Sequence, residues 1–223
     1  MRIGIPLETK SGESRVAATP ETVKKLITAG HSLIIQSHAG VKASIIDEAF
    51  TAAGATIGSA TEVFNCDIVL KVRAPSDDEL NQMRPGTVLI GMLDPFDSAT
   101  INAMAGKQIT AFALEAAPRT TRAQSMDVLS SQANIAGYKA VMLAANTYQR
   151  FMPMLMTAAG TVKAARVLIL GAGVAGLQAI ATAKRLGAVI EASDVRPAAK
   201  EQIESLGAKF VDVPFETEEE KEI

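Results

Sequence analysis

The run Val167-Leu-Ile-Leu170 leads directly into Gly171-Ala-Gly173-Val-Ala-Gly176, and apolar residues at helical spacing follow at once. A buried strand, a G-x-G-x-x-G turn and a helix stand in the order that a dinucleotide-binding βαβ unit requires. Gly171 would allow the tight turn, Gly173 would leave room for a pyrophosphate, and Gly176 would let the helix pack closely on the strand. The phosphates would lie on the free N–H groups of the helix N-terminus, where the helix dipole favours an anion.

A carboxylate follows the next strand of this unit. Residues 188–193 are expected to form that strand, and Asp194 lies at about the twenty-residue offset where an acid takes the adenosine ribose hydroxyls. Because an acid there repels a 2′-phosphate, the pattern favours NAD(H) over NADP(H). Arg196 could accept that phosphate or be a solvated cation at a helix start, and the sequence leaves both open. The cofactor-binding residues predicted in this segment are Gly171, Ala172, Gly173, Val174, Ala175, Gly176, Asp194, Val195 and Arg196.

Outward from this unit, short β-branched runs alternate with amphipathic stretches along the whole chain, which predicts an α/β protein with doubly wound parallel sheets. A polar stretch begins at Pro118 and separates two such series. Strands are expected at 2–6, 31–36, 67–71, 87–93, 108–114, 166–170, 188–193 and 209–213. Helices are expected at 19–30, 47–54, 77–83, 98–106, 130–151, 174–186 and 197–206.

The pattern predicts two Rossmann-like domains joined by the long helix, at residues 1–130 and 131–223. The first is expected to be complete by about residue 115, whereas the second has three strands where a full sheet has about six. We therefore expect the second domain to be incomplete and the chain to be a fragment of a longer protein.

Composition and charge narrow the classes of partner. With 48% hydrophobic and 21% charged residues the chain can bury a sizeable core, and a formal charge of −2 gives no reason to bind nucleic acid or an anionic membrane surface. The N-terminus lacks the apolar region of a signal peptide, and the longest uncharged run, 167–183, contains the glycine turn, so no membrane span is expected. A single cysteine, Cys66, excludes an internal disulfide and a zinc site built on cysteines, and no metal site is predicted.

Polar side chains recur at helical spacing where the long helix begins. Helix capping by Asp127 and solvation of Arg119 would account for part of this pattern. The same groups are also what a nicotinamide carboxamide and its ribose require, in a loop that joins two lobes, and this second interpretation is favoured. The polar residues at this spacing are Asp127, Ser130, Asn134 and Tyr138.

The segment Pro118-Arg-Thr-Thr-Arg-Ala-Gln-Ser-Met-Asp-Val-Leu-Ser-Ser-Gln-Ala-Asn-Ile-Ala-Gly-Tyr138, together with residues 2–6, 13–20 and 171–197, resembles the NAD(H)-binding component of proton-translocating nicotinamide nucleotide transhydrogenase, the N-terminal part of its alpha subunit. In that family the loop holds the dihydronicotinamide of NADH. The resemblance implies that Arg119, Asp127 and Ser130 contact this ring and that Gln124 reaches toward NADP(H) on a separate domain. These four residues are the catalytic candidates.

The resemblance also implies an activity and partners. Hydride would pass directly from NADH on this chain to NADP⁺ on an NADP(H)-binding domain or beta subunit, coupled in the full complex to proton translocation through a membrane domain. The chain would be a peripheral component on the cytoplasmic (or matrix) face of the inner membrane, in a homodimer.

Two alternatives remain. Alanine dehydrogenase shares the fold, and its pyruvate site uses an Arg, a Lys and a His; Arg15 and Lys71 match the first two, but Asp94 stands at the histidine position. Reduction of a keto acid or imine needs a proton donor and a carboxylate anchor, whereas transfer between two nicotinamide rings needs neither. The residues therefore favour transhydrogenase. The second alternative is a noncatalytic NAD(H)-binding protein.

Overall fold

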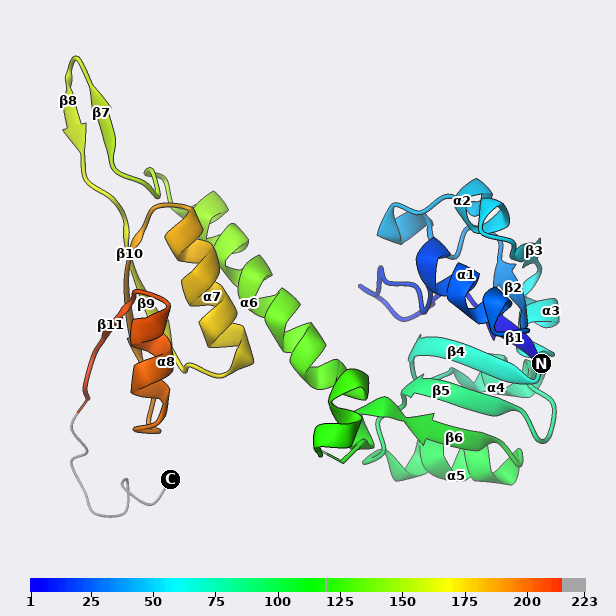
Figure 1. The fold of residues 1–223 in the computed structure, drawn as a ribbon. Coiled ribbons are helices and arrows are strands. Elements are labelled where there is room, and N and C mark those ends of the chain that lie inside the picture. Colours follow the sequence, from blue (N-terminus) through cyan, green and yellow to red (C-terminus); the bar gives the residue numbers. More distant parts are fainter. Residues whose placement is uncertain (119, 214–223) are drawn as a thin grey trace. The chain divides into compact units, whose positions relative to one another are not determined.

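The structure is a computed structural model that describes residues 1–118 and 120–213. The chain divides into two compact units, Met1–Asp127 and Val128–Ile223, and each contains a parallel sheet (Figure 1). The predicted fold class is confirmed: a six-stranded parallel sheet and a smaller parallel sheet belong to successive units joined by a long helix.

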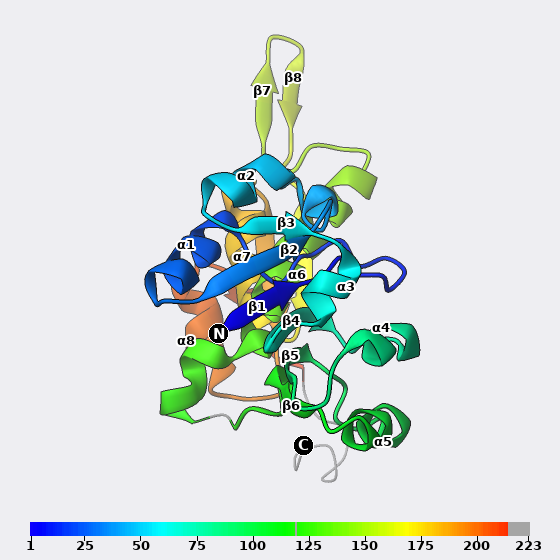
Figure 2. The ribbon, with the colours of Figure 1, turned by 90° about the vertical axis from the view of Figure 1, so that its right-hand side faces the viewer.

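Unit 1 is built on a sheet whose strands run in the order β3-β2-β1-β4-β5-β6, with every pair parallel (Figure 2). This is the strand order of a complete Rossmann sheet. β1 is central, with Ile3 opposite Leu33 on one side and Ile68 on the other. The strands are β1 (Arg2–Ile5), β2 (Ser32–Gln36), β3 (Thr56–Gly58), β4 (Ile68–Arg73), β5 (Val88–Met92) and β6 (Thr110–Ala113).

The helices of unit 1 begin at residues that satisfy their free N–H groups. Thr19 accepts from the Thr22 N–H ahead of a proline at the first helical position, and Ser59 and Ser76 each form a capping box with the glutamate three residues later. The α-helices are α1 (Pro20–Thr28), α2 (Asp47–Ala52), α3 (Ala60–Phe64), α4 (Asp77–Gln82) and α5 (Ser98–Gly106). Short 3₁₀ turns are η1 (Val41–Ala43), η2 (Leu114–Ala116) and η3 (Thr121–Met126).

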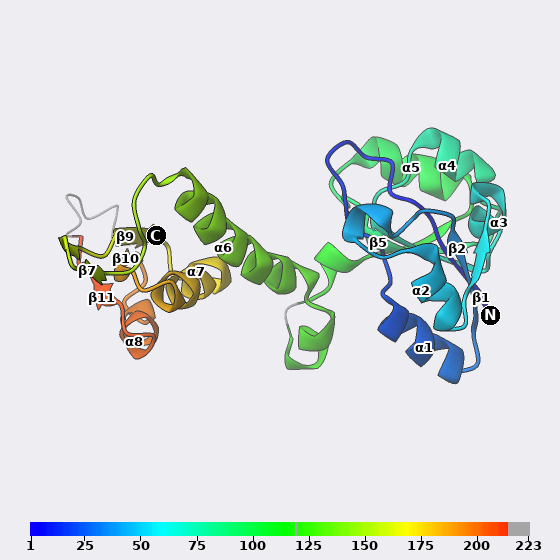
Figure 3. The ribbon, with the colours of Figure 1, turned by 90° about the horizontal axis from the view of Figure 1, so that it is seen from above.

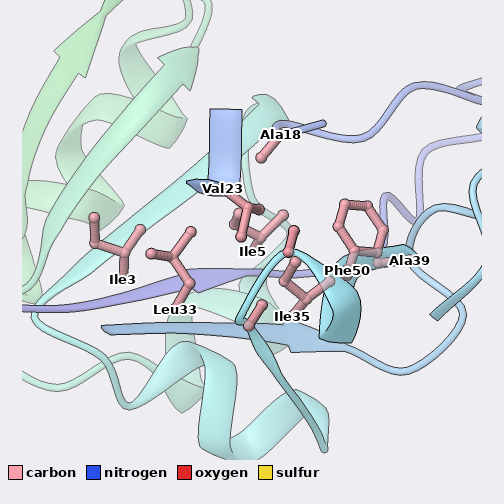
Figure 4. Close-up of a cluster of buried hydrophobic side chains, with 10 residues drawn as sticks. Ile3, Ile5, Ala18, Val23, Leu33, Ile35, Ala39 and Phe50 are labelled. Carbon is pink, nitrogen blue, oxygen red and sulfur yellow. The ribbon is translucent and has the colours of Figure 1, made fainter. Parts of the chain in front are cut away.

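The two faces of this sheet carry separate cores. Ile5, Ile35 and Phe50 are fully buried in the cluster under α1 and α2, and Figure 4 shows side chains of that cluster gathered over β1 and β2. Val69 and Leu89 belong to a second cluster, with side chains of α3, α4 and α5. Burial on both faces explains why the strands read as apolar runs rather than as an alternating pattern.

Unit 2 begins with the long helix α6 (Val128–Thr147), which lies against α7 (Figures 1 and 3). Its parallel sheet has the order β11-β10-β9, which is the first half of the order seen in unit 1. A separate antiparallel hairpin, β7 and β8, precedes this sheet in the chain. The remaining elements are β7 (Leu155–Thr157), β8 (Gly160–Val162), β9 (Arg166–Leu170), α7 (Val174–Arg185), β10 (Val189–Ser193), α8 (Ala199–Ser205) and β11 (Lys209–Phe210).

The three-stranded sheet is covered on one face. Ile180 of α7 and Ile203 of α8 are fully buried, in a cluster that Val167 and Ile169 of β9 join. The alternate side chains of β9 lie on the other face, where Leu168 is 56% exposed and Leu170 is 78% exposed. An apolar strand with one open face is unusual in a parallel sheet.

Several local expectations were wrong. Strands β3, β7 and β8 and helix α3 were not predicted, and α6 ends at Thr147 rather than at residue 151. In the part of the chain that is described, no helix is long and apolar enough to cross a membrane.

Candidate functional site

The glycine turn connects β9 to α7 with a close backbone approach. Gly171 has a φ of 88°, and its N–H donates to the Ser193 carbonyl at 2.8 Å. A Cβ added to Gly176 would lie 1.8 Å from the Gly171 carbonyl oxygen, so a side chain there cannot fit. Among residues 1–118 and 120–213, a Cβ on Gly173 would meet no atom within 4 Å. The turn is therefore tightly packed on the strand side and open at the end of the helix.

The open side presents the N-terminus of α7. Gly173 is the N-cap and, as a glycine, supplies no capping side chain, while Leu177 donates to the Gly173 carbonyl at 2.9 Å. The N–H groups of Val174, Ala175 and Gly176 precede that first intrahelical bond and have no helical carbonyl to pair with. These N–H groups and the helix dipole together suit an anion such as a pyrophosphate.

Asp194 lies beside this turn because β10 pairs with β9, with Ser193 opposite Leu170. Its Oδ2 accepts from the Ala172 N–H at 2.6 Å, and its side chain is only 6% exposed. Arg196 also donates to this carboxylate: its N–H and Nε lie 2.9 Å from Oδ1, and Nη2 lies 3.0 Å from Oδ2. The structure therefore brings the turn, Asp194 and Arg196 together at the carboxyl ends of adjacent strands.

These donors fix the charge of the Asp194 carboxyl. The side-chain hydrogen bonds from Arg196 hold its pKa well below the usual range, the Ala172 and Arg196 N–H groups lower it further, and partial burial opposes them. The group is an anion at physiological pH. A buried anion can accept hydrogen bonds from hydroxyls and repels a phosphate, which is the chemistry expected of a ribose-binding acid.

The other predicted site residues lie elsewhere in the chain. Arg119 is outside the described residues, Gln124 lies in η3, Asp127 is the last residue of unit 1, and Ser130 lies in the first turn of α6 in unit 2. Farther along α6, the Asn134 side chain donates to Gln178 of α7 at 3.1 Å. Asn134 therefore joins two helices, which accounts structurally for one member of the polar pattern.

A second charged cluster lies in unit 1, and the sequence singled out its Lys71 and Arg15 but not the carboxylates that pair with them. Lys71 is a buried residue inside β4, and its Nζ lies 3.1 Å from Glu79 Oε1 and 3.4 Å from Glu8 Oε2. A lysine inside an apolar strand run requires such partners, so that run was the available signal. Glu79 lies only eight residues after Lys71, on the next helix, whereas Glu8 comes from a distant part of the sequence and could not be identified from it.

Arg15 pairs with another carboxylate of unit 1, that of Glu13. Glu13 Oε2 lies 2.6 Å from Arg15 Nη2 and 2.9 Å from Arg73 Nε. The hydrogen bonds from Arg15, and then from Arg73, lower the pKa of Glu13 to about 2 against the opposing effect of burial. Arg15 and Lys71 are thus both paired with carboxylates of this chain.

Asp94, which stands where alanine dehydrogenase has a histidine, has a φ of 53°, and its N–H donates to Glu115 at 2.7 Å.

The glycine turn after the first strand of a parallel sheet and the acid after the second define a Rossmann-like α/β protein of the dinucleotide-binding class. The chain belongs to the alanine dehydrogenase/PNT family. The model of the N-terminal domain of that family matches residues 4–136, and the model of its C-terminal domain matches residues 140–223.

Known proteins resemble the chain over nearly all of its length. The first part of NAD(P) transhydrogenase subunit alpha from Rhodospirillum rubrum is 53% identical over 97% of this chain, which spans 58% of that relative. Alanine dehydrogenase from Bilophila wadsworthia is 34% identical over 92% of the chain, which spans 55% of it. The crystal structure of transhydrogenase from Sinorhizobium meliloti matches with a TM-score of 0.92 and 54% identity, over 95% of this chain and 64% of that one. The chain thus spans less than two thirds of these relatives.

Proposed function

We propose that this chain is the NAD(H)-binding part of a proton-translocating nicotinamide nucleotide transhydrogenase. The observation that carries the proposal is the buried, ionised Asp194 beside an open glycine turn, in a chain with 53% identity to a transhydrogenase alpha subunit. NADH would supply a hydride from its C4, which passes directly to C4 of NADP⁺ held by a partner domain.

The chain would hold the cofactor by groups at the carboxyl end of its small sheet. The N–H groups of Val174, Ala175 and Gly176 would bind the pyrophosphate, while Ala172 and Gly173 shape the turn. Asp194 would accept from the adenosine ribose hydroxyls, and Val195 and Arg196 would flank that ribose. By resemblance to the family, Arg119, Asp127 and Ser130 would contact the dihydronicotinamide, and Gln124 would reach toward NADP(H).

The role of the protein would be to position the two nicotinamide rings for hydride transfer. Bringing the two C4 atoms to roughly 3–3.5 Å with water excluded accounts for direct transfer, and no side chain has to act as an acid or base. The complete assembly would include the NADP(H)-binding beta subunit, a membrane domain that moves protons and a second copy of this chain. It would lie on the cytoplasmic face of the inner membrane.

The charged cluster in unit 1 argues against the alanine dehydrogenase alternative. A keto-acid substrate needs cations free to anchor its carboxylate. Here Glu8 and Glu79 flank Lys71, whose side chain is 1% exposed, and Glu13 pairs with Arg15. Lys71 in particular is buried between two carboxylates, which fits a structural role better than substrate binding.

One assay separates the three functions. The natural polypeptide that contains this chain is mixed with NADH and an NADP⁺-loaded partner domain, and separately with NADH, pyruvate and ammonium. We expect oxidation of NADH in the first mixture only. Oxidation in the second mixture alone would overturn the proposal in favour of alanine dehydrogenase. Binding of NADH without oxidation in either mixture would instead indicate a noncatalytic NAD(H)-binding protein.

A further inference from the structure

The Asp194 carboxylate has no acceptor position left for a ribose. Its two oxygens each accept two hydrogen bonds, from the Ala172 N–H, the Arg196 N–H and two groups of the Arg196 guanidinium. A carboxylate offers about four lone-pair positions in total. Because the adenosine ribose presents two hydroxyls, two of these four bonds must be released before both hydroxyls can bind.

The four donors differ in how easily they can leave. Two are backbone N–H groups, and Ala172, which carries one of them, is buried in the glycine turn. The other two belong to the Arg196 side chain, which is 60% exposed and lies in the loop between β10 and α8. Rotation of that side chain into solvent frees one position on each oxygen and leaves the two backbone bonds to hold the carboxylate in place.

We propose that the Arg196 guanidinium is a latch on the ribose-recognition carboxylate, which it must release before the dinucleotide binds. The inference rests on the proposed function, since it takes Asp194 as the acceptor of the ribose hydroxyls. The measured affinity for the dinucleotide equals the affinity of the open form multiplied by the fraction of molecules in which the latch is open. Ion pairs with an exposed partner are weak, so we expect the closed latch to reduce affinity about two- to sixfold.

The latch opposes only ligands that need the carboxylate, which suggests a direct test. The probes are ADP and 2′,3′-dideoxy-ADP, which share a pyrophosphate but differ in the ribose hydroxyls, and the protein is the natural polypeptide that contains this chain. The measured quantity is the Kd of dideoxy-ADP divided by the Kd of ADP. Loss of a cation weakens binding of both phosphate ligands and cancels in this ratio.

Two variants of Arg196 separate the latch from simple charge. Arg196→Ala removes the side chain, and Arg196→Lys keeps the charge but lacks the planar fork that holds both oxygens. We expect the ratio to rise about two- to sixfold in Arg196→Ala and by a smaller factor in Arg196→Lys. Asp194→Asn is the reference and should lower the ratio below that of the wild type, because an uncharged amide with one acceptor oxygen replaces the carboxylate.

The outcomes distinguish the latch from the site that it covers. An unchanged or lower ratio in both arginine variants would overturn the latch, and a lower ratio would mean that Arg196 supports Asp194 in ribose binding. If Asp194→Asn keeps the wild-type ratio, the ribose assignment fails and the latch fails with it. If neither nucleotide binds to the wild type, the proposed dinucleotide site is wrong. Should the asparagine variant not fold, the arginine variants still decide the matter.

Discussion

Asp194 is the residue on which dinucleotide affinity should depend most. We expect Asp194→Ala to weaken NADH binding by about 1–3 kcal/mol, because charge-assisted hydrogen bonds to the ribose are lost. Titration of NADH fluorescence measures the change. Glu191→Gln is the matched control, since Glu191 lies on β10, the strand that leads to Asp194, and pairs with Arg166 at the surface. Equal affinity of Asp194→Ala and wild type would remove the ribose assignment.

Glu13 should make the stability of unit 1 depend on acidity. Its pKa is about 2 in the folded protein and near 4.5 otherwise. The folded state binds this proton less readily than the unfolded state, so the stabilisation is complete above pH 4.5 and is lost as the pH falls toward 2. We expect Glu13→Gln to cost about 2 kcal/mol at neutral pH.

Urea denaturation at several pH values checks the Glu13 prediction. Between pH 4.5 and the acid limit of the measurement, the wild type should lose stability faster than Glu13→Gln, so that the two curves converge. Parallel curves would show that Glu13 is not the group that titrates.

Among the elements, the longer ones were predicted more completely than the short ones, although the two-residue strand β11 was expected within 209–213. In the described chain the strands of four or more residues were all expected, whereas the missed strands β3, β7 and β8 have three residues each. Three residues are too few for a period of two to be recognised. The five-residue helix α3 was missed although Ser59 and Glu62 form a capping box whose spacing is visible in the sequence.

The candidate site was predictable where it follows from element order. A strand, a glycine turn and a second parallel strand necessarily bring Asp194 beside the turn, because adjacent strands end at the same edge. The two hydrogen bonds from the Arg196 guanidinium to Asp194 were not predictable, because they depend on a side-chain rotamer. The Glu8–Lys71 contact could not be predicted either, since it joins segments far apart in the chain.

The contact of α6 with α7 depends on Gly137. A Cβ on Gly137 would lie 2.1 Å from the Ala175 carbonyl oxygen, which cannot move aside as a flexible side chain could. We expect Gly137→Ala to destabilise the protein by about 1–3 kcal/mol and to weaken NADH binding, since Ala175 lies in the first turn of α7.

Gly106→Ala is the matched control for this helix contact. Gly106 ends α5, and a Cβ there would meet no atom of the described residues within 4 Å. We expect a change within about 1 kcal/mol, toward higher stability, because alanine loses less backbone entropy on folding. Thermal denaturation of both variants makes the comparison, and equal effects would contradict the proposed role of close packing at Gly137.

At the scale of the whole molecule, both units leave part of an apolar sheet face open. In unit 1, Phe112 on the edge strand β6 is 55% exposed beside Ile90. In unit 2, Leu168 and Leu170 of β9 lie on the face opposite α7 and α8. Parallel sheets are ordinarily covered on both faces, so these patches are where the 223-residue chain should associate or aggregate most readily.

The open face of β9 gives a prediction with an internal control. We expect replacement of Leu168 and Leu170 by lysine to change the stability of the 223-residue chain by no more than about 0.5 kcal/mol and to raise its solubility, because both side chains are exposed. Ile169→Lys, one position away on the same strand, should cost about 3 kcal/mol or more, since it places a charge in the core under α7 and α8. Denaturant titration with sedimentation velocity measures both effects. A loss of stability in the double lysine variant as large as that of Ile169→Lys would mean that this face is covered in solution, and a simultaneous fall in sedimentation coefficient would identify a second copy of the chain as the cover.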